Sequence, residues 1–299
     1  MISPFHFFAM VVQQIGPQRL ERRPEPNQIT ERAENILQYD RVMTTKLAVA
    51  YAAGLETVHR ARPVGQSDKA IDLACGPGHY TLCLARYLGY KDVLGVDLSA
   101  GMVQVGANNA ISQRLESQVK FRQGDIRSLD TVGDGEFDLA SFTDAAHHMP
   151  DLTTVTGVLR EMDRVTRRDG LLMVMDLVRL RSESLTEQYV KVLGQGYVDQ
   201  GLPEFLADFR NSMYAAWTPA ELASAVPRDT GRWWYHITPR LLPTIQILLG
   251  LPIGRKRPFI RRAARWRDAQ VPISSQNRGD WAILLATLNW GKKRIIGLQ

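Results

Sequence analysis

An acidic residue followed at once by a turn of small residues is the first place in the chain where chemistry could occur. Asp72 lies at the end of a short apolar run and precedes the small residues 74–78, of which Gly76 and Gly78 tolerate positive φ and let a ligand approach the backbone. Apolar residues at helical spacing follow from residue 82, so the pattern predicts a strand, a tight turn and a helix. The free N–H groups at the start of that helix favour a carboxylate or a phosphate.

The residue types in this turn narrow the class of ligand. A dinucleotide-binding loop carries its first glycine directly after the strand and a third glycine further on. Here Ala74 occupies the first small position, and Tyr80 and Thr81 stand where a third glycine would be. Asp72 would repel a pyrophosphate but suits a ligand with a cationic amine. A glycine-rich turn that binds no ligand remains the alternative interpretation.

The segment 72–78 resembles motif I of the class I S-adenosylmethionine-dependent methyltransferases, whose usual form is D/E-x-G-x-G-x-G. The departure from that form is Ala74 in place of the first glycine. The resemblance implies S-adenosylmethionine as the cofactor, with Asp72, Ala74, Gly76 and Gly78 among the residues that bind it.

A second acidic residue follows the next apolar run, at residues 92–98. A carboxylate there is placed to accept hydrogen bonds from both ribose hydroxyls of a nucleoside. Because NAD enzymes share this demand, Asp97 alone does not discriminate between the two cofactors. Asp97, Ser99 and Met102 resemble the methyltransferase pattern D-x-S-x-x-M, which implies that Leu98 and Met102 flank the adenine.

A third acidic residue follows an alternating segment, residues 119–125, which predicts another strand. The sequence at its end, Gly124, Asp125 and Ile126, resembles the family's third motif. In that motif the acid accepts a hydrogen bond from the adenine amino group, and the next backbone N–H donates to the ring. The alternative is a strand that simply ends in a turn, for which Gly-Asp is common.

Two adjacent histidines follow the predicted fourth strand, residues 137–144. The segment that contains them resembles the L-H-H-x-P-D segment of the ubiquinone/menaquinone-type branch of small-molecule methyltransferases. In that branch the residues just past this strand line the site beside the transferring methyl group. The resemblance therefore implies cofactor contacts from Thr143, Asp144 and His148, and a substrate contact from His147.

The same histidines are the candidates for catalysis. Methyl transfer from a sulfonium is an in-line displacement, so the protein mainly aligns the nucleophile and excludes water. A hydroxyl or an acidic carbon as acceptor would need a base, and the pKa of histidine suits His147 or His148 to that task. Alternatively, His148 holds the loop by hydrogen bonding. A metal-assisted type would need several carboxylates near this strand, and the sequence shows no clear set, so no metal site is predicted.

The alternation of these segments with helical patterns predicts an α/β fold. The resemblance covers residues 70–178 and implies a Rossmann-like, seven-stranded, mostly parallel sheet with an antiparallel last strand, helices on both faces, a helical N-terminal extension and a helical lid insert. Residues 167–170 are interpreted as the turn that ends a helix before the fifth strand, residues 171–177. The sixth and seventh strands are predicted at residues 232–238 and 281–289.

The predicted organisation is one large domain with N-terminal additions. Tyr39, in the additional helix, is by resemblance a contact for the methionine end of the cofactor. Tyr214 and Trp217 belong to an aromatic face that either binds the substrate or packs in the core. The predicted parts are a flexible N-terminal arm and linker (1–28), a helical cap (29–62) and a methyltransferase domain (63–299) with a helical lid at 183–226 and an apolar and basic insert at 239–280.

One segment accounts for the net charge of +6. Residues 255–267 contain seven cationic side chains and no acid, beside the apolar stretch 241–253. This combination predicts a peripheral contact of residues 241–267 with an anionic membrane surface or lipid. A lipophilic anionic substrate, nucleic acid and a solvated basic helix are the alternatives.

The remaining global features favour a cytoplasmic protein. Cys75 and Cys83 suit neither a disulfide nor a metal clamp, so they are predicted to be reduced thiols. Residues 1–12 are apolar, but they lack the basic flank and cleavage site of a signal peptide and are too short to cross a bilayer.

The predicted function is S-adenosylmethionine-dependent methyl transfer to a small organic molecule, either a specialised metabolite or a lipid- or quinone-like compound, with S-adenosylhomocysteine as product. A nucleic-acid methyltransferase is disfavoured because residues 143–146 lack the Asn/Asp-Pro-Pro-aromatic segment expected after the fourth strand. A nicotinamide oxidoreductase is disfavoured by Asp72 and the missing third glycine. A sensor, scaffold or non-methylating catalyst that binds the cofactor stays open, because such motifs report binding and not turnover. The acceptor atom and the oligomeric state are not predicted.

Overall fold

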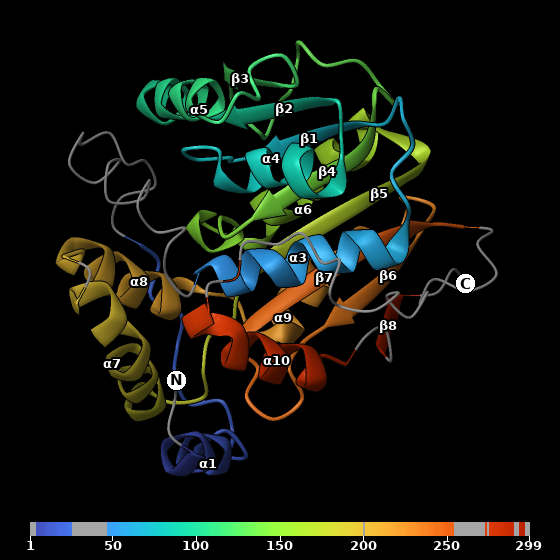
Figure 1. The fold of residues 1–299 in the computed structure, drawn as a ribbon. Helices are drawn as coiled ribbons and strands as arrows, with labels where there is room; N and C mark the ends of the chain where they lie inside the picture. Colours follow the sequence, from blue (N-terminus) through green and yellow to red (C-terminus); the bar gives the residue numbers. More distant parts are fainter. Residues whose placement is uncertain are drawn as a thin grey trace.

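Strands that are mostly apolar and buried build the central sheet of the protein (Figure 1). The computed structural model describes residues 4–25, 47–199, 201–253, 273, 275–289 and 293–296. In this part of the chain the sheet has eight strands, in the order β3-β2-β1-β4-β5-β7-β6-β8. The strands are β1 (Lys69–Leu73), β2 (Asp92–Asp97), β3 (Val119–Gln123), β4 (Phe137–Thr143), β5 (Thr166–Leu177), β6 (Arg232–Ile237), β7 (Ile245–Pro252) and β8 (Lys293–Ile296).

Helices connect and cover these strands. The longer ones are α1 (Pro4–Gln13), α3 (Leu47–Ala61), α5 (Ala100–Ser112), α6 (Leu152–Val165), α7 (Glu183–Asp199), α8 (Pro203–Ala215) and α10 (Arg278–Thr287). The short ones are α4 (His79–Cys83), the π-helix η2 (Leu84–Leu88), η3 (Ala146–His148), α9 (Pro219–Ser224) and η5 (Ser275–Asn277). Within the described residues, no helix is both long and apolar enough to cross a lipid bilayer.

The strand directions position the site. β1 is parallel to β2 and β4, and β7 is antiparallel to both β5 and β6. The predicted mostly parallel sheet with one antiparallel strand is therefore confirmed, and β8 adds an eighth strand, antiparallel to β6, at the edge. The strand order reverses between β1 and β4, and ligands bind outside the carboxyl ends of such strands.

Two apolar layers enclose the sheet because alternate strand residues point to opposite faces. Ala70 packs in a cluster with α3, η2 and α10, whereas the next residue, Ile71, packs with α6 and α9. Figure 1 shows α3, α4 and α10 together on the near side of the sheet. Both cysteines, Cys75 and Cys83, are buried and unbridged.

A third apolar cluster joins α1, α7 and α8 beside the sheet. Met10 of α1 is completely buried in it. From α1 the chain continues extended, and the N–H groups of Arg19 and Leu20 donate to the carbonyl of Arg181 at 2.8 and 3.1 Å. The N-terminal segment was expected to be a flexible arm and linker, but residues 4–25 are packed against the rest of the protein.

The prediction of the seventh strand at residues 281–289 is wrong. Residues Arg278–Thr287 form α10, and the antiparallel strand is β7, which lies inside the segment predicted as an apolar and basic insert. A short, uniformly apolar run fits a helix and a strand equally well, so periodicity could not decide between them. Pro252 is the last residue of β7 and ends it.

The beginning of β5 also differs from the prediction. The strand begins at Thr166 and not at residue 171, but residues 167–170, which were expected to form a turn, have no partner in β4 because the register shifts between Phe137 and Leu139. The buried guanidinium of Arg232 donates to the carbonyl of Gly170 at 2.7 Å and to that of Arg167 at 2.9 Å. It also pairs with Asp163 of α6, so one side chain from β6 holds this segment in place.

Candidate active site

A cavity of about 380 Å³ opens at the carboxyl ends of β1, β2 and β4. Its walls come from the turn after β1, the end of β2, the loop after β3, the segment after β4 and, opposite them, helix α8. The predicted site residues that line it are Ala74, Gly76, Asp97, Leu98, Met102, Asp125, Ile126, Thr143, Asp144, His147 and His148.

Asp72 is at the predicted strand end, but its carboxylate is turned away from the cavity. The side chain is completely buried and accepts hydrogen bonds from the hydroxyls of Thr81 and Ser141, both at 2.7 Å. Burial raises the pKa of Asp72 to about 6, although the two hydroxyl donors oppose the rise. This carboxylate therefore supports the turn through buried hydrogen bonds and does not line the cavity. Tyr39, the other predicted contact for the amino-acid end of the cofactor, lies outside the described residues.

The turn after β1 presents its backbone to the cavity. Ala74, Gly76 and Gly78 all have positive φ, at 51°, 54° and 81°. A Cβ atom on Gly76 would meet nothing within 4 Å, so this glycine leaves open space beside the cavity. A Cβ atom on Gly78 would lie 2.3 Å from the Phe121 ring, so this position does not line the cavity but needs glycine for packing.

Asp97 joins the end of β2 to that turn. Its Oδ2 accepts a hydrogen bond from the N–H of Gly76 at 2.8 Å, and its Oδ1 accepts one from the N–H of Ser99 at 2.9 Å. Burial raises the pKa of Asp97, although these backbone donors oppose the rise. Ser99 in turn caps α5, since its hydroxyl accepts a hydrogen bond from the N–H of Met102.

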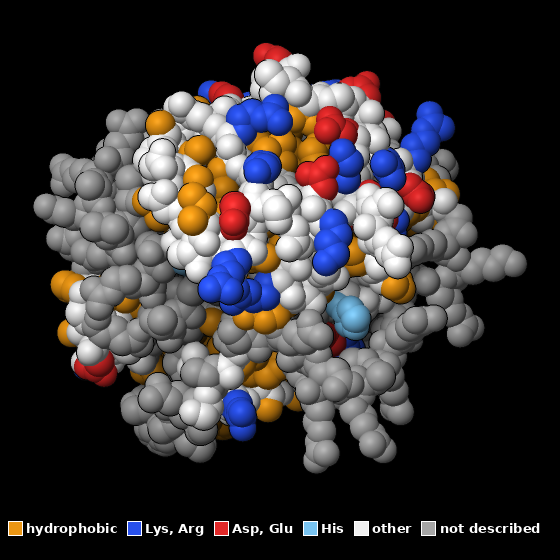
Figure 2. Space-filling model, turned by 45° about the horizontal axis from the view of Figure 1, so that its top comes forward, with side chains coloured by type: hydrophobic (Ala, Val, Ile, Leu, Met, Phe, Trp, Pro, Cys, Tyr) orange, Lys and Arg blue, Asp and Glu red, His pale blue; other side chains and the backbone are white. Residues whose placement is uncertain are grey.

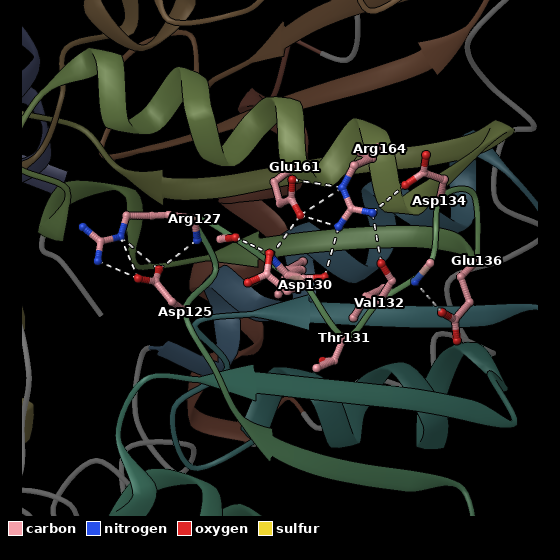
Figure 3. Close-up of polar contacts among 12 residues, drawn as sticks. Asp125, Arg127, Asp130, Thr131, Val132, Asp134, Glu136, Glu161 and Arg164 are labelled. Atoms are coloured by element: carbon pink, nitrogen blue, oxygen red, sulfur yellow. Dashed lines mark hydrogen bonds and ion pairs between the residues drawn. The ribbon is translucent and has the colours of Figure 1, made fainter.

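Asp125 and Ile126 form the far wall of the cavity. The carboxylate of Asp125 is paired with the guanidinium of Arg127, whose hydrogen bonds lower the pKa of Asp125 (Figure 3). The loop that carries both residues is held on α6, where Arg164 pairs with Glu161 and donates to the backbone carbonyls of Leu129 and Val132 (Figure 3).

Asp144, at the end of β4, is the buried acid that faces the cavity without a partner in the described residues. Neither of its carboxylate oxygens has a hydrogen-bond donor there, and its φ is +48°. Its N–H donates to the carbonyl of Met175 at 2.7 Å, which fixes the backbone. Burial and the nearby Asp176 raise the pKa of Asp144 to about 7, and His147 opposes this rise. A buried polar atom without a partner in a cavity wall is suited to a cationic ligand.

The two histidines lie side by side in η3. Nδ1 of His147 lies 2.6 Å from Oδ1 of Asp176, and Nδ1 of His148 lies 2.7 Å from Oε2 of Glu25. Burial alone would lower the pKa of His147, but the negative charges of Asp176, Glu25 and Asp144 raise it to about 9.

Glu25 is held between both histidines and α8. Burial would raise the pKa of Glu25, but the hydrogen bond and charge of His148 lower it to about 2. The hydroxyl of Ser212 donates to its Oε1 at 2.6 Å. Sequence reasoning missed Glu25 and Asp176, because neither lies in a motif that points to this cavity.

Arg22, also missed, fastens the N-terminal segment to the histidine loop. Its guanidinium donates to the backbone carbonyls of His147, Met149 and Pro150 at 2.7 to 3.0 Å, and to one carbonyl at the end of α8. It also lies over the Trp217 ring, 3.7 Å from the centroid. One arginine thus holds together three segments that are far apart in the sequence.

We expect Arg22→Lys to lower the free energy of unfolding by about 1–2 kcal/mol. A single ammonium cannot serve four carbonyls and stack on an indole as the planar guanidinium does. Urea unfolding followed by circular dichroism measures the change. Arg19→Lys, an exposed change in the same segment, is the control and should stay within about 0.5 kcal/mol of wild type. Equal losses in both variants would contradict the role assigned to Arg22.

The predicted substrate contacts Tyr214 and Trp217 do not line the cavity. The Trp217 indole N–H donates to the carbonyl of Ala146 at 2.8 Å, and the Tyr214 hydroxyl donates to a carboxylate on α7. Two other aromatic residues of that region, Phe205 and Phe209, do line the cavity and give it an apolar wall. Helix α8 therefore contributes to the cavity wall through residues other than the two that were predicted.

Three comparisons with known proteins agree with this geometry. Residues 71–174 match the family model described as a methyltransferase domain. The chain is 30% identical over 93 residues to a demethylmenaquinone methyltransferase of Lactobacillus johnsonii, which covers 31% of this chain and 38% of that protein. It is 28% identical over 118 residues to one of Geobacillus sp., which covers 39% of this chain and 50% of that protein. The chain therefore spans half or less of the length of these two relatives.

The fold is also found among solved structures. A SAM-dependent methyltransferase from Aquifex aeolicus superposes with a TM-score of 0.51, over 75% of this chain and 100% of that chain, at 14% identity. This likeness confirms the fold class predicted from the motifs, and the family match falls within the residues 70–178 that carry the resemblance.

Proposed function

We propose that this chain, whose residues 71–174 form a class I S-adenosylmethionine-dependent methyltransferase domain, catalyses methyl transfer from that cofactor to a small organic molecule, with S-adenosylhomocysteine as product. The observation that carries the proposal is the meeting of the motif residues at one cavity. Ala74 and Gly76, Asp97, and Asp125 with Ile126 come from three different strand ends and line the same space.

Each wall suits one part of the cofactor. The carboxylate of Asp97 would accept the ribose hydroxyls. Leu98 and Met102 would flank the adenine, whose polar edge would meet Asp125 and the N–H of Ile126. When bound, the cofactor supplies an electrophilic methyl group on a sulfonium.

Asp144, and not Asp72, is placed to contact the cationic amino group of the cofactor. The amino group of the cofactor is a cation and needs an anionic partner. Asp72 is buried behind the turn with both oxygens engaged, whereas Asp144 lines the cavity with both oxygens unpartnered in the described residues. We therefore assign the contact with the ammonium group to Asp144, with Thr143 beside it.

The acceptor would lie between the cofactor walls and helix α8. Phe205 and Phe209 would cover its apolar part and exclude water. His147 and His148 are at that end of the cavity, where they would hold or activate the acceptor's nucleophilic group. The relatives named as demethylmenaquinone methyltransferases support a quinone-like acceptor.

A peripheral contact with a membrane is a narrower proposal. The segment predicted to make this contact is residues 241–267, and its basic part, residues 255–267, lies outside the described residues. Residues 245–252 form β7, which is buried in the sheet, so they cannot form such a surface. On the described part of the face in Figure 2, acidic and basic side chains are interspersed, so this part of the surface does not favour nucleic acid.

Methyl transfer is tested by incubating the purified chain with S-adenosylmethionine labelled in the methyl group and a panel of reduced naphthoquinols, benzoquinols and simple phenols. We expect label in the organic extract for at least one quinol. Labelled product for none of the panel, in a protein that binds S-adenosylhomocysteine, would contradict the proposed reaction and favour a cofactor-binding protein without transfer.

A further inference from the structure

Three metal-ligating side chains from distant parts of the chain converge at the acceptor end of the cavity. Glu25 comes from the extended N-terminal segment, and His147 and His148 come from η3 after β4. One ligand atom from each residue lies within 4.8 Å of the other two. The two imidazoles line the cavity, and the ring centroids are 4.2 Å apart.

We propose that Glu25, His147 and His148 bind one divalent transition-metal ion at the wall of the cavity. Two imidazole nitrogens and one carboxylate oxygen form a donor set that suits Zn²⁺ or Fe²⁺ better than Mg²⁺ or Ca²⁺, which prefer oxygen ligands alone.

The surrounding groups orient these side chains as the neighbours of metal ligands usually do. Asp176 holds Nδ1 of His147 at 2.6 Å, which leaves Nε2 as the ligand atom, 3.9 Å from Oε1 of Glu25. A carboxylate behind a ligating histidine fixes the ring and raises its basicity. Ser212 likewise holds Glu25 by a hydrogen bond of 2.6 Å.

The spacing of the ligand atoms is close to what a metal ion requires. Ligands at about 2.1 Å from a tetrahedral zinc ion are about 3.4 Å from one another. Oε2 of Glu25 lies 2.7 Å from Nδ1 of His148, and Oε1 of Glu25 lies 3.9 Å from Nε2 of His147. One ligand atom from each residue lies within 4.8 Å of the other two, which is within about 1.5 Å of the required spacing. Small rotations of the side chains would therefore suffice.

The local charge also favours a cation. Glu25, Asp144 and Asp176 all act electrostatically on His147. A divalent ion bound to the imidazoles would be attracted by the same carboxylates. An ion pair between Glu25 and His148 alone is the competing explanation for their contact, and the experiment below separates the two.

The position of the site suggests what the ion does. Three protein ligands leave a coordination position open, and the imidazoles face the space assigned to the acceptor. An acceptor oxygen in that position would lose its proton more readily and be fixed beside the cofactor. This role rests on the proposed function, whereas binding of the ion does not.

The test is a titration of the chain, stripped of metal with a chelator, with Zn²⁺ by calorimetry and with Co²⁺ by the visible absorption of the bound ion. We expect one site per chain. Glu25→Gln and His148→Gln should each weaken Zn²⁺ binding at least tenfold, and Asp176→Asn should weaken it by about 10- to 100-fold. The control is His59→Gln, which changes an exposed histidine outside the cluster and should bind Zn²⁺ as wild type does.

Equal Zn²⁺ affinity in wild type and in the double variant Glu25→Gln, His148→Gln would overturn the proposal and leave an ion pair only. Thermal unfolding in the presence of chelator shows whether each variant folds. If Glu25→Gln does not fold, the single variant His148→Gln replaces the double variant, and Zn²⁺ affinity equal to that of wild type would overturn the proposal in the same way. Titration with S-adenosylhomocysteine in chelator is independent of the ion, so failure of the metal site and failure of the proposed function give different results.

Discussion

Replacing Asp97 with alanine should weaken the binding of S-adenosylhomocysteine by about 100-fold. Two hydrogen bonds from ribose hydroxyls to a carboxylate are worth about 3 kcal/mol together, and each 1.4 kcal/mol is a factor of ten in affinity. The substitution also removes the acceptor for the N–H groups of Gly76 and Ser99, which loosens the turn that faces the cofactor. Isothermal calorimetry measures the affinity.

The matched control for this variant is Asp92→Ala. Asp92 is the same residue type at the opposite end of the same strand, where it is exposed and pairs with Lys69 at 3.0 Å. Its removal should leave the affinity for S-adenosylhomocysteine within a factor of two of wild type. Wild-type affinity in Asp97→Ala would show that the ligand binds elsewhere.

Replacing Asp72 with asparagine should stabilise the fold at neutral pH by about 3 kcal/mol. Burial raises the pKa of Asp72 from 3.8 to about 6, and each pKa unit corresponds to about 1.4 kcal/mol. Asparagine removes the buried charge but keeps hydrogen-bonding partners for Thr81 and Ser141, whose hydroxyls can donate or accept.

The sign of this effect gives it a pH dependence. The unfolded chain releases the Asp72 proton near pH 3.8 and the folded chain releases it near pH 6, so wild type loses stability as the pH rises between these values. The difference between variant and wild type should therefore be small at pH 4 and constant above pH 7. Urea unfolding at several pH values measures it. Asp92→Asn, an exposed change at the start of β2, is the control and should not stabilise the fold at pH 7. A similar slope in wild type and Asp72→Asn would contradict the assignment.

Features encoded by neighbouring residues were predictable from the sequence. Asp97 and Ser99 lie where expected because an acid at a strand end and a helix cap depend on a few consecutive residues. The mostly parallel sheet followed from the resemblance over residues 70–178, whose alternation of strands and helices leaves few topologies.

Features that depend on residues far apart in the sequence could not be predicted from it. Asp72 was identified, but its orientation depends on Thr81 and on Ser141 from β4, which no local pattern reveals. Glu25 reaches His148 across 123 residues, because Arg22 ties the N-terminal segment to the histidine loop. No periodicity within the N-terminal segment points to such a contact.

The central claim is that the cavity at the ends of β1, β2 and β4 binds S-adenosylmethionine. The most direct measurement is a calorimetric titration of the wild-type chain with S-adenosylhomocysteine and, separately, with NAD. We expect saturable micromolar binding of S-adenosylhomocysteine, one molecule per chain, and no binding of NAD. Binding of NAD instead, or no binding of S-adenosylhomocysteine by protein shown to be folded, would contradict the claim.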